Sequence, residues 1–327
     1  MNVEENNASG ETNQKSVDFH DLQSWTQVDE EVLLVESNEV LSAKHAELQN
    51  LKDHSVFEEV PFVSQSLVHV RWVLTEKWKN GTKHTKARLV AKGFQDKGDE
   101  NLRKDSPTCL RDSLHILLMI AANNNWLIRS LDVKCAFLQG KEIQREVFLK
   151  PPCEANTDMV WKLRKTIYGL GEASRQWYLK LKETLESLSM KMSLYDEAVF
   201  YMHVKGKLCG VIALHVDDFF FCGSDMFHHT VMEKVKSLFM ISKEEERCFN
   251  YLGLEIEQSP QMITVHQASY AKDLSVIDID KKLLKTDELP AEKFAELRSL
   301  LGQLSWLATH TRADISFDVC QLNVKLK

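Results

Sequence analysis

The sequence predicts an α+β fold. Runs typical of strands and runs typical of helices alternate along the chain, but without the regular strand–helix–strand rhythm of a doubly wound sheet. Hydrophobic residues make up 43% and charged residues 27% of the 327 residues, which excludes a disordered or fibrous chain. At this length we expect two or three lobes around shared cores.

The N-terminal end is predicted to be a tail followed by a helix. Residues 1–39 are rich in Asn, Glu and Ser without sustained periodicity, which is typical of a disordered acidic tail. A helix is expected from Ser42 to about Leu51, because its apolar residues fall near one face.

A β-hairpin with a basic surface is predicted next. Two alternating runs, 68–79 and 85–92, lie on either side of Asn80-Gly81, a pair that favours a tight turn. The stretch from Arg71 to Lys92 carries seven basic residues and one acid. The hairpin is therefore a candidate for binding anionic ligands.

The later elements are predicted from the spacing of apolar residues and from the turn residues between them. In chain order they are a helix after Ser106-Pro107 that ends at 123–125, a strand over 126–133, an apolar segment over 135–140, a strand over 161–165, a helix over 172–188, two apolar strands over 211–216 and 219–222, a helix over 230–239, a strand over 251–257, and a mainly helical segment from Gln258.

The net charge of −7 does not argue against a nucleic-acid partner. Residues 1–60 hold 14 acidic residues and 3 lysines, whereas residues 61–327 hold 38 basic and 34 acidic residues. The acidic balance is thus a property of the N-terminal end.

Cysteine spacing and hydropathy indicate a soluble intracellular protein. The seven cysteines include no C-x-x-C pair and an odd total, so neither a zinc ribbon nor a disulfide framework is predicted. No apolar run approaches the roughly 20 residues of a membrane span, and the polar N-terminus does not resemble a signal peptide.

Two adjacent acids, Asp217 and Asp218, interrupt the most apolar part of the chain. A buried ionised carboxylate needs a cation or a proton, so the pair fits a metal site. It equally fits a solvated hairpin tip, where Asp is common. Asp132, 85 residues earlier, ends another predicted strand, where it could cap the next turn or converge with the pair. Converging carboxylates suit hard cations that assist phosphoryl transfer.

The chain resembles the reverse transcriptase domain of copia-type LTR retrotransposon polyproteins over roughly residues 40–327. The resemblance is carried by short motifs in the family's order. They are A-E-L-Q-N-L-K-D-H-S-V-F-E-E-V-P (46–61), K-A-R-L-V-A-K-G-F (86–94), D-S-P-T (105–108), L-D-V-K-C-A-F-L-Q-G (131–140), V-F-L-K-P-P (147–152), W-K-L-R-K-T-I-Y-G-L (161–170), A-S-R-Q-W-Y (173–178), H-V-D-D-F (215–219), Y-L-G-L-E-I (251–256) and L-G-Q-L-S-W-L-A-T-H-T-R-A-D-I-S-F (301–317).

The resemblance implies a right-hand polymerase with fingers, a palm built on an antiparallel sheet, and a partial thumb. Residues 40–258 would form the fingers and palm. Residues 259–327 would form a helical thumb or connection segment, truncated before RNase H. The chain is therefore expected to be a fragment or a degenerate copy of a polyprotein.

The resemblance also implies a two-metal site. Asp132, Asp217 and Asp218 would be the catalytic, metal-binding acids, with the backbone carbonyl of Val133 as a further ligand. Two Mg²⁺ ions, or Mn²⁺, would activate the primer 3′-hydroxyl and stabilise the pyrophosphate leaving group.

Five residues would contact the incoming dNTP. Arg88, with Lys86 as the weaker candidate, would bind the triphosphate, whereas Lys77 and Lys79 are expected to lie on a solvated basic strand face. Phe137 would be the steric gate against a ribose 2′-hydroxyl, or else a core residue. Tyr168 and Gly169 would form the turn that packs on the nucleotide and template.

Tyr251, Leu252 and Gly253 would form the primer grip. A plain buried strand is the alternative for Tyr251 and Leu252, whereas Gly253 indicates a close backbone approach or a bulge. Arg175 and Trp177 are expected to serve helix packing and template-side contacts rather than chemistry.

The sequence departs from the family pattern at three positions. His215 replaces the usual Tyr before V-D-D, Ser174 replaces a Pro, and Ala313 stands within the usual R-P-D. A His at 215 could still stack on the primer, with a charge that varies near neutral pH. None of the three changes alters a predicted metal ligand.

The predicted function is RNA-directed DNA polymerisation on an RNA or DNA template with a primer and dNTPs, without a membrane partner. The location implied by the element's life cycle is cytoplasmic, with nuclear entry as a further stage. A non-catalytic copy that binds nucleic acid or a protein partner is the first alternative. An unrelated metal-dependent nuclease is the second, but it leaves the fingers and primer-grip motifs unexplained.

Overall fold

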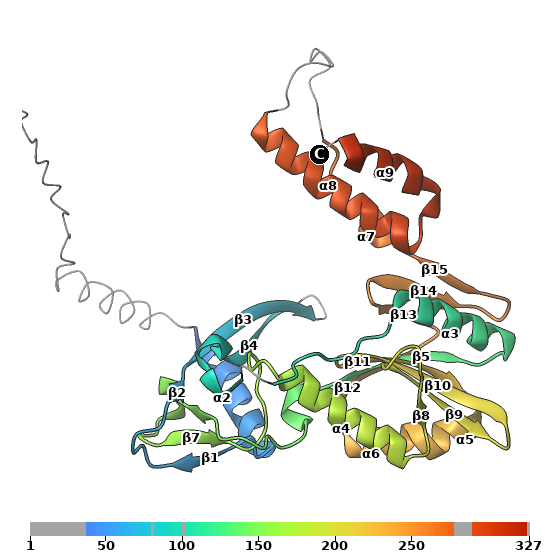
Figure 1. Cartoon of the computed structure of the whole chain (residues 1–327). Helices are drawn as coiled ribbons and strands as arrows, with labels where there is room; N and C mark the ends of the chain where they lie inside the picture. Colours follow the sequence, from blue (N-terminus) through green and yellow to red (C-terminus); the bar gives the residue numbers. More distant parts are fainter. Residues whose placement is uncertain (1–36, 80–81, 100–101, 278–289, 326–327) are drawn as a thin grey trace, which may run out of the picture. The chain divides into compact units, whose positions relative to one another are not determined.

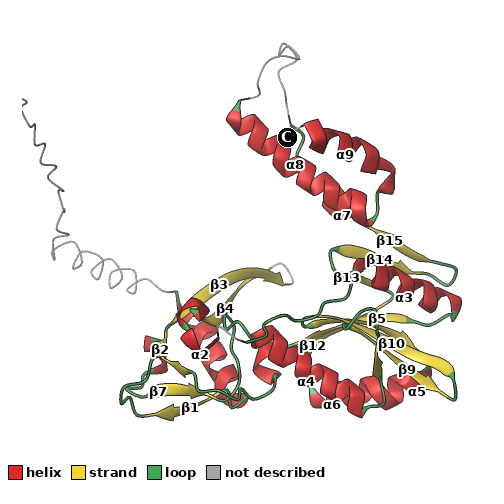
Figure 2. Cartoon of the chain, viewed as in Figure 1, coloured by secondary structure: helices red, strands yellow, loops and turns green. Residues whose placement is uncertain are grey.

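The computed structural model describes residues 37–79, 82–99, 102–277 and 290–325 (Figures 1 and 2). The chain divides into two compact units, residues 1–49 with 72–89 and residues 50–71 with 90–327. Residues 1–36 of the predicted tail and the predicted Asn80-Gly81 turn lie outside the described residues.

The smaller unit combines the start of a helix with a two-stranded ribbon. Helix α2 (Asn38–Asp53) begins in this unit, and β3 (Val70–Lys79) pairs with β4 (Thr82–Ala91). The amide of Thr85 donates to Oε1 of Glu39 at 2.7 Å, which ties the first turn of α2 to β4. The predicted helix and both strands of the predicted hairpin are confirmed.

A six-stranded sheet forms the centre of the larger unit, and every neighbouring pair in it is antiparallel. Most of its strands are buried, because residues of other elements pack against both faces of the sheet. In spatial order the strands are β12 (Ile241–Glu246), β5 (Ile128–Val133), β11 (Asp218–Gly223), β10 (Lys207–His215), β9 (Val199–Val204) and β8 (Lys191–Met192).

Burial on both faces explains the unbroken apolar run in β11. Alternate side chains of a strand point to opposite faces. Phe220 contacts Tyr251 at 6.0 Å between ring centroids, whereas Phe221 contacts His228 at 5.8 Å. Helices α3 (Arg111–Asn123) and α4 (Ala173–Ser187) cover opposite faces of the sheet (Figure 1).

Two smaller sheets complete the larger unit. The four-stranded sheet holds β1 (Phe57–Val60), β7 (Val160–Leu163), β6 (Phe148–Leu149) and β2 (Leu67–Val68) in that order. The three-stranded sheet holds β13 (Cys248–Tyr251), β14 (Leu254–Gln258) and β15 (Ile263–His266).

The other helices lie mainly in the C-terminal half of the chain. They are α5 (Asp225–Phe227), a π-helical turn (His228–Met232), α6 (Glu233–Leu238), α7 (Ala268–Lys272), α8 (Ala291–His310) and α9 (Ser316–Lys325). Short 3₁₀ turns are formed by Gly93–Gln95, Lys97–Asp99, Ala136–Gln139, Cys153–Ala155 and Ala313–Ile315.

The described elements confirm the α+β class, but they correct two local predictions. The strand predicted over 251–257 is a hairpin, because Leu252 and Gly253 both have positive φ, at 53° and 75°, and turn the chain. The described part of the segment from Gln258 is mainly helical, as predicted, and it also contains β15. The helix predicted over 230–239 begins with a π-helical turn.

Candidate active site

Backbone pairing brings two of the predicted acids side by side. Asp132, near the end of β5, is the direct partner of Asp218, the first residue of β11. Directly opposite residues of an antiparallel pair point to the same face, with Cβ atoms about 4.5–5.5 Å apart. The two carboxylates therefore leave the sheet on the same side.

Asp217 lies in the tight turn that joins β10 to β11. His215 pairs with Asp218, so Val216 and Asp217 form a two-residue connection. The amide of Val133 donates to the main-chain oxygen of Asp217 at 2.9 Å, which ties the turn to β5. All three predicted acids thus lie at the same end of the β5–β11 pair.

The turn has an unusual backbone conformation. Val216 has a φ of 57°, and a β-branched residue in the left-handed region is a genuine outlier. The indole N–H of Trp177, on α4, donates to the main-chain oxygen of Val216 at 2.7 Å. Contacts from α4 and from β5 therefore hold the two peptide carbonyls of this turn.

Negative charge is concentrated at the site. Three causes raise the pKa of Asp218 to about 6: partial burial of the carboxyl is the largest, and repulsion from Asp217 and then from Asp132 adds to it. The rest of the side chain is exposed to solvent. Like charges in close proximity have this effect unless a cation neutralises them. The site therefore has the electrostatic character of a cation site.

Ser242 on β12 contacts the third acid. The β12–β5 pairing shifts register between Ile241 and Lys243, a β-bulge that leaves Ser242 as the extra residue. Its hydroxyl donates to Oδ2 of Asp132. In the part of the chain that the structure describes, no group of three or more His, Cys, Asp or Glu side chains is arranged so that it could hold a metal ion.

The residues nevertheless fit a divalent cation. Asp132, Asp217 and Asp218 offer carboxylate oxygens, the ligands that Mg²⁺ and Mn²⁺ prefer. Asp132 and Asp218 share one face of the sheet, and the proton affinity of Asp218 is raised by the other two acids. Val133, the fourth predicted ligand, is buried at the end of β5 next to Asp132.

Phe137, Tyr168 and Gly169 form a second group. Phe137 is half-buried on the 3₁₀ turn after β5, and its ring centroid lies 5.2 Å from that of Tyr168. The main-chain oxygen of Tyr168 accepts from the amide of Ala91 at 2.7 Å. Gly169 has a φ of 91°, and a Cβ there would lie 2.2 Å from the oxygen of Ala91. Glycine is therefore required at this close approach.

Lys86 and Arg88 lie on β4, in the residues assigned to the smaller unit. Lys86 is exposed and Arg88 is half-buried. Their predicted contact with a triphosphate stays a prediction.

The predicted primer grip is a β-turn rather than a strand. Tyr251 ends β13 fully buried, and its hydroxyl donates to the main-chain oxygen of Ala213 at 3.2 Å. Leu252 and Gly253 form the turn itself. The Tyr251 side chain is therefore a core residue, and the turn residues are the accessible part of the motif.

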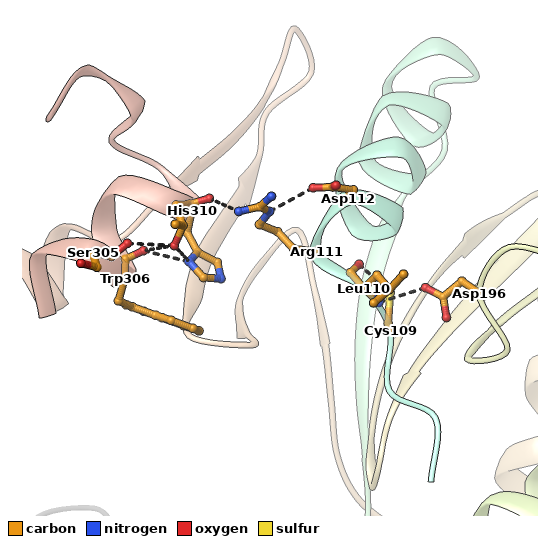
Figure 3. Close-up of polar contacts among 9 residues, drawn as sticks. Cys109, Leu110, Arg111, Asp112, Asp196, Ser305, Trp306 and His310 are labelled. Carbon is orange, nitrogen blue, oxygen red and sulfur yellow. Dashed lines mark hydrogen bonds and ion pairs between the residues drawn. The ribbon is translucent and has the colours of Figure 1, made fainter. Parts of the chain in front are cut away.

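A cavity of about 430 Å³ lies beside this turn. Arg111 connects the two helices that border it: its guanidinium pairs with Asp112 at 3.0 Å and donates to the main-chain oxygen of Thr309 at 2.5 Å, near the end of α8 (Figure 3). The lining residues are Cys109, Arg111, Leu114, His215, Leu252, Gly253, Leu254, Trp306 and His310.

His215, the residue that departs from the family pattern, is half-buried in the wall of this cavity. Among the described residues, its Nδ1 has no hydrogen-bond partner. Burial lowers the pKa of His215, and Asp217 only partly offsets this. The imidazole is therefore favoured in its neutral form, rather than varying in charge near neutral pH.

Comparison with known proteins identifies the family. A model of the family described as reverse transcriptase (RNA-dependent DNA polymerase) matches residues 59–287, more than half of the chain. The chain belongs to this family. Together with the transposon polyproteins described next, this match confirms the predicted membership of the copia-type reverse transcriptases.

Curated relatives of this reverse transcriptase domain are transposon polyproteins. The Pol polyprotein of transposon RE1 from Arabidopsis thaliana is 32% identical over 278 residues, covering 79% of this chain and 19% of the relative. That of transposon TNT 1-94 from Nicotiana tabacum is 27% identical over 314 residues, covering 87% of this chain and 24% of the relative. The chain therefore spans about a fifth of the length of the relatives it matches.

Among solved structures, the chain is similar to a foamy viral protease–reverse transcriptase in complex with an RNA/DNA hybrid. The TM-score is 0.47 at 12% identity, covering 89% of this chain and 34% of the other. Members of the reverse transcriptase family generally use divalent metal ions. Within the described ranges, no helix has the length and apolar character needed to cross a membrane.

Two contacts of the site were missed by sequence reasoning. Ser242 reaches Asp132 across 110 positions of the chain, and Trp177 reaches Val216 across 39. Trp177 was expected to serve helix packing, which its full burial confirms, but its hydrogen bond gives no signal in the sequence.

Proposed function

We propose that this reverse transcriptase domain adds dNTPs to the 3′-end of a primer on an RNA or DNA template. The observation that carries the proposal is the pairing of Asp132 with Asp218 across β5 and β11, with Asp217 in the adjoining turn. The six-stranded sheet would serve as the palm. Residues 40–258 would form the fingers and palm, and residues 259–327 the thumb or connection segment.

The catalytic ligands would be the carboxylates of Asp132, Asp217 and Asp218 and the main-chain oxygen of Val133. Two bound Mg²⁺ or Mn²⁺ ions would activate the primer 3′-hydroxyl and stabilise the pyrophosphate leaving group. The contribution of the chain itself is position, because β5 and β11 fix where the carboxylates start. The raised pKa of Asp218 supports a site that needs added positive charge.

Separate roles are proposed for the five residues predicted to bind the incoming nucleotide. Arg88, with Lys86 beside it in sequence, would bind the triphosphate, because a guanidinium can pair with two phosphate oxygens. Phe137 would exclude a ribose 2′-hydroxyl, and its contact with Tyr168 supports a ring held in place. The Tyr168–Gly169 turn would pack on the nucleotide and template.

The primer would be gripped by the turn at Leu252 and Gly253. Tyr251 would support that turn from the core through its bond to Ala213, rather than touch the primer itself. The cavity beside the turn supports this role, because Leu252 and Gly253 line it.

Primer extension tests the proposal. We expect incorporation of dTTP on poly(rA)/oligo(dT) with Mg²⁺ or Mn²⁺, and its loss in Asp217→Asn, because that change removes a ligand charge. Asp158→Asn is the matched control, since Asp158 is exposed in the loop before β7. Incorporation that survives Asp217→Asn would contradict the mechanism.

A second outcome separates the alternative function. Binding of the template–primer that falls steeply with salt, without incorporation, would indicate a non-catalytic nucleic-acid-binding copy. For a working element we propose cytoplasmic particles, with a nuclear stage, as the location.

A further inference from the structure

Trp177 connects the helix behind the sheet to the turn that carries the acids. The side chain is completely buried on α4, and its Nε1–H donates to the main-chain oxygen of Val216 at 2.7 Å. Its ring is fixed independently by an edge-on contact with Phe239, with centroids 5.1 Å apart and planes at 81°. The donor is therefore a rigid group.

The peptide that Trp177 holds is one that the chain does not favour by itself. Val216 has a φ of 57°, and such a conformation persists only where the surroundings impose it. The next carbonyl, that of Asp217, is held by the amide of Val133 at 2.9 Å. One bond comes from the helix and the other from β5, so the turn is fixed from two elements.

Burial of an indole does not by itself require such a bond in this protein. Trp161 on β7 is also buried, at 1% exposure, yet within the described residues its Nε1 has no hydrogen-bond partner. The bond of Trp177 is thus not a general consequence of burying a tryptophan. What distinguishes Trp177 is its acceptor, the peptide immediately before Asp217.

We propose that Trp177 is a positioning residue, which holds the Val216 carbonyl and thereby keeps Asp218 opposite Asp132 and Asp217 in the adjoining turn. The proposal rests on the proposed polymerase function for its catalytic consequence. Its structural part concerns only the turn. Trp177 would act through Val216 and would touch neither substrate nor metal.

The test removes one hydrogen-bond donor and keeps the shape of the ring. Benzothienylalanine, which has sulfur in place of the indole N–H, is incorporated at position 177, and the same substitution at position 161 is the matched control. Amide hydrogen exchange at residues 214–219 and at Val133 reports on the turn. Losing one hydrogen bond should speed local exchange by about 3- to 10-fold at position 177 and leave it unchanged at position 161.

The kinetic arm uses primer extension by the full chain. We expect kcat to fall by about tenfold in the position-177 variant, with KM for dNTP and Kd for template–primer within about twofold, because only the geometry of the acids changes. Trp177→Phe, compared with Trp161→Phe, gives the same comparison with ordinary residues.

The outcomes distinguish the two proposals. Unchanged exchange at the turn would overturn the positioning role, as would faster exchange spread evenly over the whole chain. Faster exchange confined to the turn with an unchanged kcat would also overturn it. If the unmodified chain has no polymerase activity at all, faster exchange at the turn in the position-177 variant would still support the positioning role, and the missing activity would reject the proposed function.

Discussion

Asp132 of β5 lies directly opposite Asp218 of β11, so two carboxylates share one face of an antiparallel pair. Like charges in directly opposite positions destabilise a sheet. Neither strand gains from this arrangement in the folding of the domain, because an apolar or hydrogen-bonding pair would stabilise it more. The site is therefore expected to lower the stability of the protein when no cation is bound.

Asp218→Asn should raise the free energy of unfolding at pH 7 in the presence of EDTA. Solvent screens the repulsion at this exposed carboxylate, so we expect a gain of up to about 1 kcal/mol, or roughly 2 °C in Tm. Because the pKa of Asp218 is raised to about 6 in the folded protein, ionisation costs stability as the pH rises toward and above 6.

The gap in Tm between Asp218→Asn and wild type should therefore close as the pH falls from 7 to 4, where the carboxyl is protonated in the folded protein. Thermal unfolding at several pH values measures this. Asp158→Asn should show no such gap. A lower Tm for Asp218→Asn at pH 7 would show that Asp218 stabilises the fold.

Ser242→Ala should weaken binding of a divalent ion. The Ser242 hydroxyl donates to Oδ2 of Asp132, which orients that carboxylate. Loss of a partner that orients a ligand typically costs 10- to 100-fold in metal affinity, and we expect about tenfold here. Mn²⁺ titration followed by electron paramagnetic resonance measures the Kd without any need for activity.

Two variants control this experiment. Ser242→Thr keeps the hydroxyl and should restore most of the affinity. Ser237→Ala removes a hydroxyl that donates to the main-chain oxygen of Lys234 on an exposed turn of α6, and it should leave the Kd unchanged. Equal Mn²⁺ affinity in Ser242→Ala and wild type would show that the contact with Asp132 does not orient a ligand.

Arg145→Met should strongly destabilise the larger unit. The guanidinium pairs with Asp96 at 2.5 Å and with Glu172 at 2.8 Å, and both carboxylates are almost completely buried. Removing the cation leaves two buried acids without compensation, which typically costs about 3–5 kcal/mol. Urea unfolding measures the loss.

Arg164→Met is the matched control, because Arg164 pairs with Glu58 at 2.8 Å on the exposed side of the β1–β7 pair. An exposed ion pair contributes about 0–1 kcal/mol. Similar losses in the two variants would mean that burial of the Arg145 cluster is unimportant for stability.

Gly169→Ala should be more disruptive than Gly206→Ala. Both glycines have positive φ, at 91° and 78°, so both substitutions strain the backbone by about 1 kcal/mol. Only at Gly169 would the new Cβ also meet the Ala91 oxygen, whereas nothing lies within 4 Å at Gly206. We expect at least twice the loss of stability at Gly169, measured by urea unfolding. Equal losses would indicate that the close approach relaxes without cost.

The sequence allowed the strands around the acids to be predicted, but not their pairing. The runs at 211–216 and 219–222 are apolar because both faces of β10 and β11 are buried, so composition alone located them. The register that sets Asp218 against Asp132 depends on contacts between distant segments. Only the family resemblance indicated it beforehand.

The bulge at Ser242 and the bond from Trp177 could not be predicted for the same reason. Each depends on which residue of one element faces which residue of another, and a shift of one position would redirect the side chain. The turn at Leu252 and Gly253 was missed because buried residues on both of its sides made one apolar run. Its glycine was the available signal.

Phe137→Ala should relax the choice between dNTPs and rNTPs. Phe137 follows β5 on the 3₁₀ turn Ala136–Gln139, five positions after Asp132, and its ring is held by Tyr168 at 5.2 Å. If the ring occupies the space of a 2′-hydroxyl, its removal should lower the ratio of kcat/KM for dTTP over UTP by about tenfold or more. Primer extension with each nucleotide measures that ratio. Phe57→Ala, which removes a ring stacked on Trp161 at 3.9 Å, should lower stability and leave the ratio unchanged. An unchanged ratio in Phe137→Ala would make Phe137 a core residue, and the discrimination of sugars would then have to come from another part of the site.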